Sequence, residues 1–313
     1  MEIIANTLDF EIEGRTAIAI GKFDGIHVGH RKLLTEITDA KKDGLLACVF
    51  TFDPPASVFF GGGCQGELTT REEKRQIFEQ LGVDVLVEFP LNRETAATSP
   101  EQFVLEYLHE RLHAGLVVAG TDLSFGAGGR GNTALLQVMG KQLDMDVKTI
   151  DKVRMEGREV SSTYIRELLL RGDMPMVTRL LGAPYRVCGK IVHGNHIGHT
   201  IGFPTANIVV DREKLMPPYG VYFTKAFCNG RVWPAISNVG VKPTVEAGAR
   251  CGVETHLYGF GEDIYGEELT VELVQFVRPE RKFDGLTDLI AQLEKDVPAG
   301  ESFWKQEKMK KLL

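Results

Sequence analysis

The sequence contains no hydrophobic run close to the roughly twenty residues that a helix needs to cross a bilayer. Its first residues, MEIIANTLDFEIEG, are acidic and lack the basic start and apolar centre of a signal peptide. Its five cysteines are scattered and never form a CxxC pair, which argues against a disulfide framework or a zinc site. We therefore expect a cytoplasmic protein without a membrane partner.

The sequence also lacks the surplus of basic residues that nucleic-acid-binding proteins carry. The net charge is −7; residues 1–183 hold 20 Lys and Arg against 27 Asp and Glu, and residues 184–313 hold 16 of each kind. Nucleic acid is therefore not an expected partner, and an anionic ligand has to be held by a helix N-terminus, a few cations or a metal ion. The 313 residues suggest two domains, and self-association into a homo-oligomer is compatible with the sequence.

Residues 1–183 alternate between apolar runs of strand length and segments with helical spacing. Strands are expected at 16–20, 45–52, 83–89, 115–120 and 146–150, with helices between them. Thr70 and Glu73 form a capping box at the start of one of these helices. This alternation predicts a doubly wound, Rossmann-like α/β domain with a parallel sheet.

The pattern changes near Gly182–Tyr185, which places the boundary between a domain at 1–183 and a domain at 184–313. Strand-like segments then follow at 185–192, 220–240, 253–260 and 268–277. Asn229-Gly230 marks a tight hairpin turn within the second of these segments. Two helices are expected at 283–296 and 301–313. We therefore predict a small antiparallel β-barrel with C-terminal helices.

Residues 21–30, GKFDGIHVGH, follow the first expected strand, at a position where open α/β folds bind ligands. His27 and His30 share one face of the first helical turn. The glycines around them are Gly21, Gly25 and Gly29. A phosphate suits this helix N-terminus, and two imidazoles can stabilise charge that develops on phosphorus. The alternative is that both histidines are ordinary loop and capping residues.

The HxGH pattern resembles the signature of the nucleotidyltransferase superfamily, which transfers AMP or CMP and releases pyrophosphate. Residues 161–172, SSTYIRELLLRG, are similar to the SSTxIR motif that closes the nucleotide site in that superfamily. The alternative for this segment is a capped amphipathic helix with a surface arginine. The resemblance implies that His27, His30 and Arg166 are catalytic. The ATP and phosphate contacts that it implies here are Gly21, Phe23, Asp24, Gly25, Gly29, Asp122, Ser161, Ser162 and Thr163.

Residues 202–207, GFPTAN, resemble the riboflavin kinase signature, in which PTAN carries metal and phosphate contacts. Further segments continue this resemblance in order: PPYGVY (217–222), NVGVKPT (238–244), ETHLYGF (254–260) and residues 263–283. Together with HxGH, the sequence resembles the bifunctional bacterial riboflavin kinase/FMN adenylyltransferase family from about Gly21 to Asp296.

This resemblance assigns roles in the second domain. Glu254 is implied as the catalytic base, and we expect its strand to point it into the barrel. Thr205 and Asn207 are implied as Mg²⁺ ligands, Asn207 also as a catalytic residue. Gly194 and Gly198 precede PTAN in a flexible loop whose backbone N–H groups approach the ATP phosphates.

Flavin contacts are predicted at Asp53, Phe260 and Tyr265. The alternative for the two aromatic residues is that they belong to the hydrophobic core. Asp53 follows a strand in TFDPP (51–55), and Asp122 opens the glycine-rich GTDLSFGAGGRGN (120–132). Asp122 suits an adenine amino group, a ribose or a metal ion. The glycines after it alternatively form only a flexible turn.

The implied enzyme phosphorylates riboflavin with MgATP and then adenylylates FMN with a second ATP, giving FAD and pyrophosphate. No Ser/His/Asp or Cys/His nucleophile set is evident, so both transfers are expected to be direct. Pro55 stands where family members commonly carry a histidine. It leaves open a riboflavin kinase with a weak or reduced-flavin-dependent adenylyltransferase domain. A flavin-binding regulator that uses the barrel as a sensor is the alternative outside enzymes.

Overall fold

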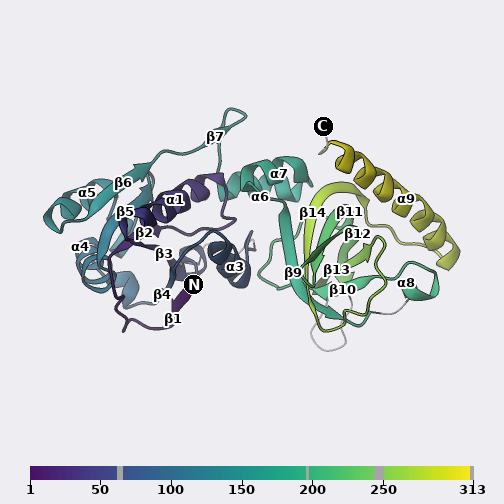
Figure 1. Ribbon diagram of the computed structural model, residues 1–313, viewed down its shortest axis with the longest axis horizontal. Helices are drawn as coiled ribbons and strands as arrows, with labels where there is room; N and C mark the ends of the chain where they lie inside the picture. The colour runs from purple at the N-terminus through teal and green to yellow at the C-terminus, as the bar shows by residue number, and fades with distance from the viewer. Residues whose placement is uncertain (62–65, 195–196, 243–249, 311–313) are drawn as a thin grey trace. The chain divides into compact units, whose positions relative to one another are not determined.

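The computed structural model describes residues 1–61, 66–194, 197–242 and 250–310 (Figure 1). The chain divides into two compact units, Met1–Ser162 and Thr163–Leu313. Helices α6 (Ser162–Leu170) and α7 (Met174–Leu181) fall almost wholly in the second unit. The boundary predicted near Gly182–Tyr185 lies just after these two helices and stays a prediction.

A six-stranded parallel sheet forms the first unit, as the alternating pattern predicts (Figure 1). Its strands in spatial order are β1 (Glu2–Ala5), β4 (Val85–Pro90), β3 (Leu46–Asp53), β2 (Thr16–Ile20), β5 (Ala114–Gly120) and β6 (Asp146–Ile150). A small hairpin pairs β7 (Arg154–Met155) with β8 (Arg158–Glu159). The sequence pattern does not predict β1, because its four residues at the sheet edge are too few to show a period.

Helices cover both faces of this sheet. They are α1 (Val28–Asp39), η1 (Ala40–Asp43), α2 (Ala56–Phe59), α3 (Arg71–Gln80), η2 (Thr95–Ala97), α4 (Pro100–Gln102), the π-helix η3 (Phe103–Arg111), η4 (Ala127–Gly129) and α5 (Thr133–Gln142). Apolar residues of α1 and α3 form one core with one face, and residues of η3 and α5 form a second core with the other. The capping box of Thr70 and Glu73 at the start of α3 is confirmed.

The strand order reverses beside β2. The chain runs from β2 through β3 to β4 on one side of β2 and then returns to β5 on the other side. Open α/β sheets bind ligands at the carboxyl ends of the strands that flank such a reversal. The loops after β2 and β5 carry HxGH and the glycine-rich segment, so both lie at this position.

A closed antiparallel barrel forms the core of the second unit, and the predicted fold class is confirmed (Figure 1). Its strands in spatial order are β10 (Ala206–Val209), β13 (Arg250–Leu257), β12 (Arg231–Lys242), β11 (Gly220–Cys228), β14 (Glu268–Pro279) and β9 (Tyr185–Val192). The short α8 (Ile197–Thr200) precedes β10, and α9 (Leu286–Lys310) follows β14. Asn229 and Gly230 form the predicted turn between β11 and β12, with φ of 49° and 70°.

One continuous helix, α9, replaces the two C-terminal helices expected from the sequence. It continues through Pro298, although a proline inside a helix removes a hydrogen bond. Packing against the barrel offsets this loss. The Tyr258 hydroxyl donates to the carbonyl oxygen of Val297 at 2.8 Å, and the ring of Phe303 stacks on Phe223 with 4.6 Å between centroids.

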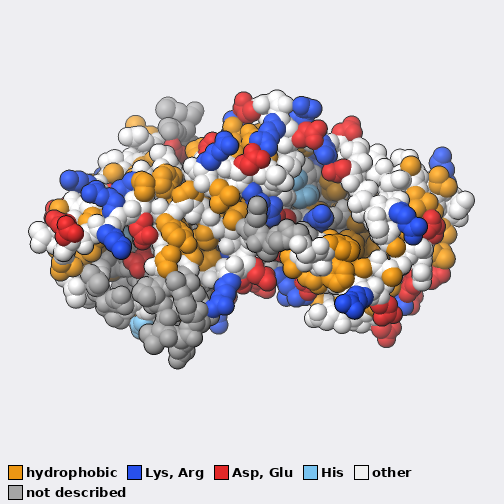
Figure 2. All heavy atoms as spheres, turned by 180° about the vertical axis from the view of Figure 1, so that it is seen from behind, with side chains coloured by type: hydrophobic (Ala, Val, Ile, Leu, Met, Phe, Trp, Pro, Cys, Tyr) orange, Lys and Arg blue, Asp and Glu red, His pale blue; other side chains and the backbone are white. Residues whose placement is uncertain are grey.

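Figure 2 shows one face of the molecule, on which acidic and basic side chains of the described residues are interspersed. Neither sign forms a continuous patch in that view. None of the helices in the described part of the chain combines the length and apolarity that a membrane span requires.

Two candidate active sites

His27 and His30 lie at the N-terminus of α1, directly after the loop that leaves β2. Their rings stack nearly parallel, with 3.7 Å between centroids and 11° between planes. The Nδ1 atom of His27 accepts a hydrogen bond from the backbone N–H of His30 at 3.2 Å. His27 is therefore the N-cap of α1. The prediction that His27 and His30 bind phosphate is supported by this position and stays a prediction.

Both imidazoles are neutral at pH 7. Burial lowers the pKa of His27 to about 4, against the opposing effect of Asp24 and Asp122. Burial, aided by the neighbouring His27, also lowers the pKa of His30 well below 6.5. Since Nδ1 of the neutral His27 accepts a hydrogen bond, its proton lies on Nε2. The Nε2–H group is therefore the donor that His27 offers to a ligand.

Two neighbours fix the histidine rings. A Cβ added to Gly29 would lie 3.1 Å from the ring of His27, so this position has no room for a side chain unless the ring moves. Phe23 is completely buried beneath His30, with 5.2 Å between ring centroids. Its side chain therefore supports His30 and is not exposed to a ligand.

The loop between β2 and α1 is fastened to two other segments. Asp24 Oδ1 accepts a hydrogen bond from the backbone of Leu68 at 2.8 Å, and the N–H of Gly25 donates to Thr69 Oγ1 at 2.9 Å. The Oγ of Ser162 donates to the carbonyl oxygen of Asp24 at 2.8 Å. The structure thus brings Ser162 next to the loop that carries HxGH. The contact of Thr69 with this loop was not predicted, because nothing in the sequence singles out Thr69 except its place just before the α3 capping box.

The other residues of these motifs are placed less fully. Gly21 directly follows β2 and donates its N–H to the carbonyl oxygen of Phe50 at 3.1 Å. Ser161 immediately precedes α6. Thr163 and Arg166 lie on α6 within the second unit, so their approach to the nucleotide stays a prediction.

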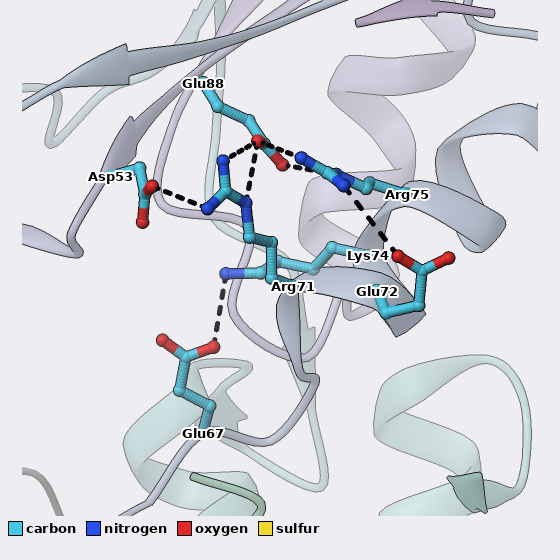
Figure 3. Close-up of polar contacts among 7 residues, drawn as sticks. All are labelled: Asp53, Glu67, Arg71, Glu72, Lys74, Arg75 and Glu88. Atoms are coloured by element: carbon cyan, nitrogen blue, oxygen red, sulfur yellow. Dashed lines mark hydrogen bonds and ion pairs between the residues drawn. The ribbon is translucent and has the colours of Figure 1, made fainter. Parts of the chain in front are cut away.

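Asp53 ends β3 and Asp122 follows β5, so both lie at the carboxyl ends of parallel strands of the sheet. Asp122 Oδ2 lies 3.2 Å from Lys152 Nζ, and it helps to raise the pKa of that lysine. Asp53 is the last residue of β3, and its Oδ2 lies 2.9 Å from an amino nitrogen of Arg71 (Figure 3). Each carboxylate is therefore held by a cation, while 32% of the Asp53 side chain stays exposed.

In the second unit, Asn207 of β10 and Asn238 of β12 lie directly opposite Glu254 of β13, one on each side. Residues opposite one another in an antiparallel pair point to the same face, with Cβ atoms about 5 Å apart. Val253 and Thr255, the sequence neighbours of Glu254, are fully buried in the barrel interior. Glu254 therefore lies on the outer face, and the expectation that it points into the barrel is wrong. Strand alternation fixes this orientation.

The PTAN segment lies beside this row with Gly194 and Gly198. Gly198 belongs to the short helix α8, so its predicted place in a flexible loop is wrong. Asn207 Nδ2 donates to the carbonyl oxygen of Thr205 at 3.2 Å and lies 3.5 Å from its hydroxyl oxygen. A Cβ on Gly194 would lie 2.7 Å from Asn207 Nδ2, and one on Gly198 would collide with the carbonyl oxygen of Phe203. The close approach of backbone to PTAN therefore depends on glycine at both positions.

The two predicted aromatic flavin contacts lie at different places. Tyr265 stacks on His193 at 4.0 Å between centroids, and His193 directly precedes Gly194. Phe260 packs against Trp233 at 5.1 Å. Trp233 precedes Asn238 on β12 by roughly 16 Å of strand. The structure therefore brings Tyr265, but not Phe260, toward the candidate kinase site.

The side chains of the described residues limit which metal ions the protein can bind. No group of three or more His, Cys, Asp and Glu in the described ranges is arranged to hold a metal ion. The hydroxyl of Thr205 and the amide oxygen of Asn207 are hard, neutral oxygen donors. They fit a Mg²⁺ ion that takes its other ligands from phosphates and water.

Comparison with known proteins assigns both units to one family. Residues 9–164 match the family described as FAD synthetase, and residues 181–304 match the family described as riboflavin kinase. The bifunctional riboflavin kinase/FMN adenylyltransferase of Bacillus subtilis (strain 168) is 36% identical over 293 residues, which cover 91% of this chain and 92% of that protein. The chain belongs to the bifunctional riboflavin kinase/FMN adenylyltransferase family.

Another member of the bifunctional family and one solved structure match more than nine tenths of the chain. The Escherichia coli (strain K12) member is 34% identical over 290 residues, covering 92% of each chain. A crystal structure named as a macrolide-efflux protein from Streptococcus pneumoniae has a TM-score of 0.84 and 30% identity, covering 96% of this chain and 98% of that one. The predicted pair of activities, riboflavin kinase and FMN adenylyltransferase, is confirmed.

Sequence reasoning missed Asn238 as a neighbour of Glu254. Its signal was present in the NVGVKPT segment, but only strand register shows that the two side chains share a face. Pro243 and Thr244, which end that segment, lie outside the described residues. Arg71, the cation that pairs with Asp53, was also missed, because nothing in its spacing relates it to TFDPP.

Proposed function

We propose that the barrel unit converts riboflavin and MgATP to FMN and that the first unit joins AMP from a second ATP to FMN. One observation carries this proposal. The adenylyltransferase candidates from Gly21 to Ser162 fall in the first unit, within the residues matched by the FAD synthetase family. The kinase candidates Thr205, Asn207 and Glu254 fall in the second unit, within the residues matched by the riboflavin kinase family. A cytoplasmic location, where ATP is available to both reactions, agrees with it.

In the kinase reaction Glu254 acts as the general base. The 5′-hydroxyl oxygen of riboflavin attacks the γ-phosphorus of ATP, the bond from that phosphorus to ADP breaks, and Glu254 takes the hydroxyl proton. Thr205 and Asn207 hold Mg²⁺, which when bound neutralises phosphate charge. The backbone N–H groups of Gly194 and Gly198 contact the ATP phosphates, and Tyr265 lies beside the flavin.

In the adenylyltransferase reaction His27 and His30 donate hydrogen bonds to the phosphates of ATP. A phosphate oxygen of FMN attacks the α-phosphorus, and the bond between the α-phosphorus and the leaving pyrophosphate breaks. Negative charge that develops on these oxygens raises the pKa of both buried imidazoles and strengthens their hydrogen bonds. Because these hydrogen bonds are stronger in the transition state than in the bound ground state, they accelerate the transfer.

The remaining predicted residues complete this site. Asp53 contacts the flavin, and Asp122 contacts the adenosine part of ATP. The phosphate contacts are assigned to Gly21, Asp24, Gly25, Gly29, Ser161, Ser162, Thr163 and Arg166. The hydrogen bond from Ser162 to Asp24 supports this grouping, because it joins the two motifs.

A time course tests the proposal. Purified protein is incubated with riboflavin, ATP and Mg²⁺, and flavins are separated by chromatography, in air and under anaerobic reducing conditions. FMN that rises and then falls as FAD appears is the expected result. FMN accumulating alone in every condition would support the kinase-only alternative, for which Pro55→His is the first variant to make. No flavin product and no riboflavin-dependent ATP use would favour the sensor alternative.

A further inference from the structure

A buried carboxylate, Glu88, anchors two arginines of α3 beneath the ligand-binding edge of the first unit (Figure 3). Only 4% of Glu88 is exposed. Arg75 binds it with both ends of the guanidinium, Nε to Oε1 at 2.9 Å and an amino nitrogen to Oε2 at 2.6 Å. Arg71 also donates to Oε2, from Nε at 2.8 Å and from one amino nitrogen at 2.5 Å. The two arginines are one helical turn apart, so both reach the same carboxylate.

Charge balance explains why this cluster holds together. Burial alone would raise the pKa of Glu88, but hydrogen bonds and charge from Arg75 and Arg71 outweigh it, so the pKa lies below the usual value. One anion between two guanidinium groups leaves one positive charge without a buried partner. Asp53 supplies a second carboxylate at that point.

The sheet presents Asp53 and Glu88 on the same face. Thr51 of β3 lies directly opposite Glu88 of β4, and Asp53 follows two residues later, so all three side chains point toward α3. Arg71 uses its remaining amino nitrogen to reach Asp53 Oδ2 at 2.9 Å. It therefore connects a buried anchor to a partly exposed carboxylate at the carboxyl end of β3.

Glu88 does not require Arg71 for its own hydrogen bonds, since Arg75 already binds both of its oxygens. Lys74, on the same helix, pairs with Glu67 at 3.3 Å and not with Asp53. Among the ion pairs between described residues, the contact to Asp53 is made by Arg71. The side chain of Arg71 thus does more than neutralise Glu88.

We infer that Arg71 is a positioning residue for FMN adenylylation: anchored on Glu88, it holds the Asp53 carboxylate in the orientation that meets the flavin substrate. The inference rests on the proposed function of the first unit and on the proposed flavin contact of Asp53. The inference adds a chain of contacts that runs from Glu88 inside the sheet through Arg71 to Asp53 at the adenylyltransferase site. Without Arg71, Asp53 is free to rotate, and its contact with FMN is weakened.

The test uses full-length protein and a matched pair of variants. Arg71→Met removes the contact to Asp53 but leaves Glu88 bound by Arg75. Arg75→Met removes one charge from the same carboxylate and leaves the Arg71–Asp53 contact in place. Asp53→Asn and the double variant Arg71→Met/Asp53→Asn complete a cycle. For each protein, kcat and KM are measured for FMN and for ATP in FAD formation, with riboflavin kinase rate and thermal unfolding as fold controls.

We expect Arg71→Met to lower kcat/KM for FMN by about 10-fold or more, because a misplaced contact of about 1 Å can cost roughly 100-fold. The loss should appear as a higher KM for FMN at unchanged KM for ATP. Arg75→Met should leave kcat/KM for FMN close to the wild-type value, because the Arg71–Asp53 contact stays in place. The double variant should be no worse than Asp53→Asn alone, because Arg71 acts through Asp53.

Other outcomes overturn the inference. Equal effects of Arg71→Met and Arg75→Met would show that only the charge near Glu88 matters. Additive losses in the double variant would show that Arg71 acts independently of Asp53. If Arg71→Met does not fold, Arg71→Lys replaces it, since one ammonium cannot reproduce both contacts of the guanidinium, and a wild-type KM for FMN in that variant would refute the role. Wild-type protein that makes no FAD would overturn the proposed function as well.

Discussion

Replacing Gly29 by alanine should separate activity from stability in the first unit. The added Cβ would lie 3.1 Å from Cε1 and Nδ1 of His27. That is about 0.4 Å inside the separation of about 3.5 Å at which such atoms pack best. The ring of His27 is stacked on His30 with 3.7 Å between centroids, so it cannot relieve the clash by moving toward His30. It has to rotate away from the position in which Nε2–H faces the ligand.

The size of the effect follows from these distances. A shift of a few tenths of an ångström at a group that contacts the phosphates should lower FAD formation from FMN by roughly 10-fold, given about 100-fold for 1 Å. Alanine in place of a helical glycine stabilises a helix by up to about 1 kcal/mol. Loss of the His27 cap costs about 1 kcal/mol. The two terms nearly cancel, so the melting temperature should change by less than about 3 °C.

The assay compares wild type and Gly29→Ala in three measurements. FAD formation from supplied FMN and ATP reports the first unit, the riboflavin kinase rate of the same sample reports the second, and thermal unfolding reports the fold. A kinase rate equal to wild type with reduced FAD formation is the expected pattern. FAD formation at the wild-type rate would refute the reasoning, because it would mean that the ring position does not matter.

Three further predictions concern the rest of the molecule. Gly194→Ala should displace the Asn207 amide and lower the riboflavin kinase rate, measured by steady-state kinetics, about 10-fold or more. Gly261→Ala is the control and should leave this rate unchanged, because a Cβ at Gly261 meets open space. The folded-state pKa of His27 is about 4 against 6.5 when exposed, so the unfolded chain binds a proton that the folded state does not. The contribution of His27 to the free energy of unfolding is therefore fully present above pH 6.5 and should fall by on the order of 3 kcal/mol toward pH 4. Denaturant titrations at several pH values should show a weaker dependence of stability on pH in His27→Asn. Phe303→Ala should destabilise the barrel unit by about 2–3 kcal/mol through lost packing of α9, visible in calorimetry as a lower transition for that unit while FAD formation from FMN is retained.

Much of the fold could be predicted from local sequence patterns. Apolar runs of strand length, the Thr70 capping box and the Asn229-Gly230 turn each depend on residues close together in the chain, and the structure confirms them. The continuity of α9 could not be predicted in this way. Pro298 is a local signal for a break, and the contact of Tyr258 with Val297 that accompanies the unbroken helix comes from distant barrel residues.

The candidate sites show the same limit. The motifs indicated His27, Asn207 and Glu254, because each lies in a recognisable local pattern. The outward orientation of Glu254 depends on pairing between β10, β12 and β13, which no single segment encodes. Likewise, the connection from Glu88 through Arg71 to Asp53 depends on how α3 lies on the sheet.

The central claim is that each unit carries one of the two reactions, and two variants test it most directly. Glu254→Gln and His30→Asn proteins are each assayed for FMN formation from riboflavin and for FAD formation from FMN. Glu254→Gln should lose FMN formation by roughly 100-fold or more and keep FAD formation, since a general base contributes at least that much. His30→Asn should show the reverse, and an equimolar mixture should again make FAD from riboflavin. Loss of both reactions in either correctly folded variant, or of neither, would contradict the account.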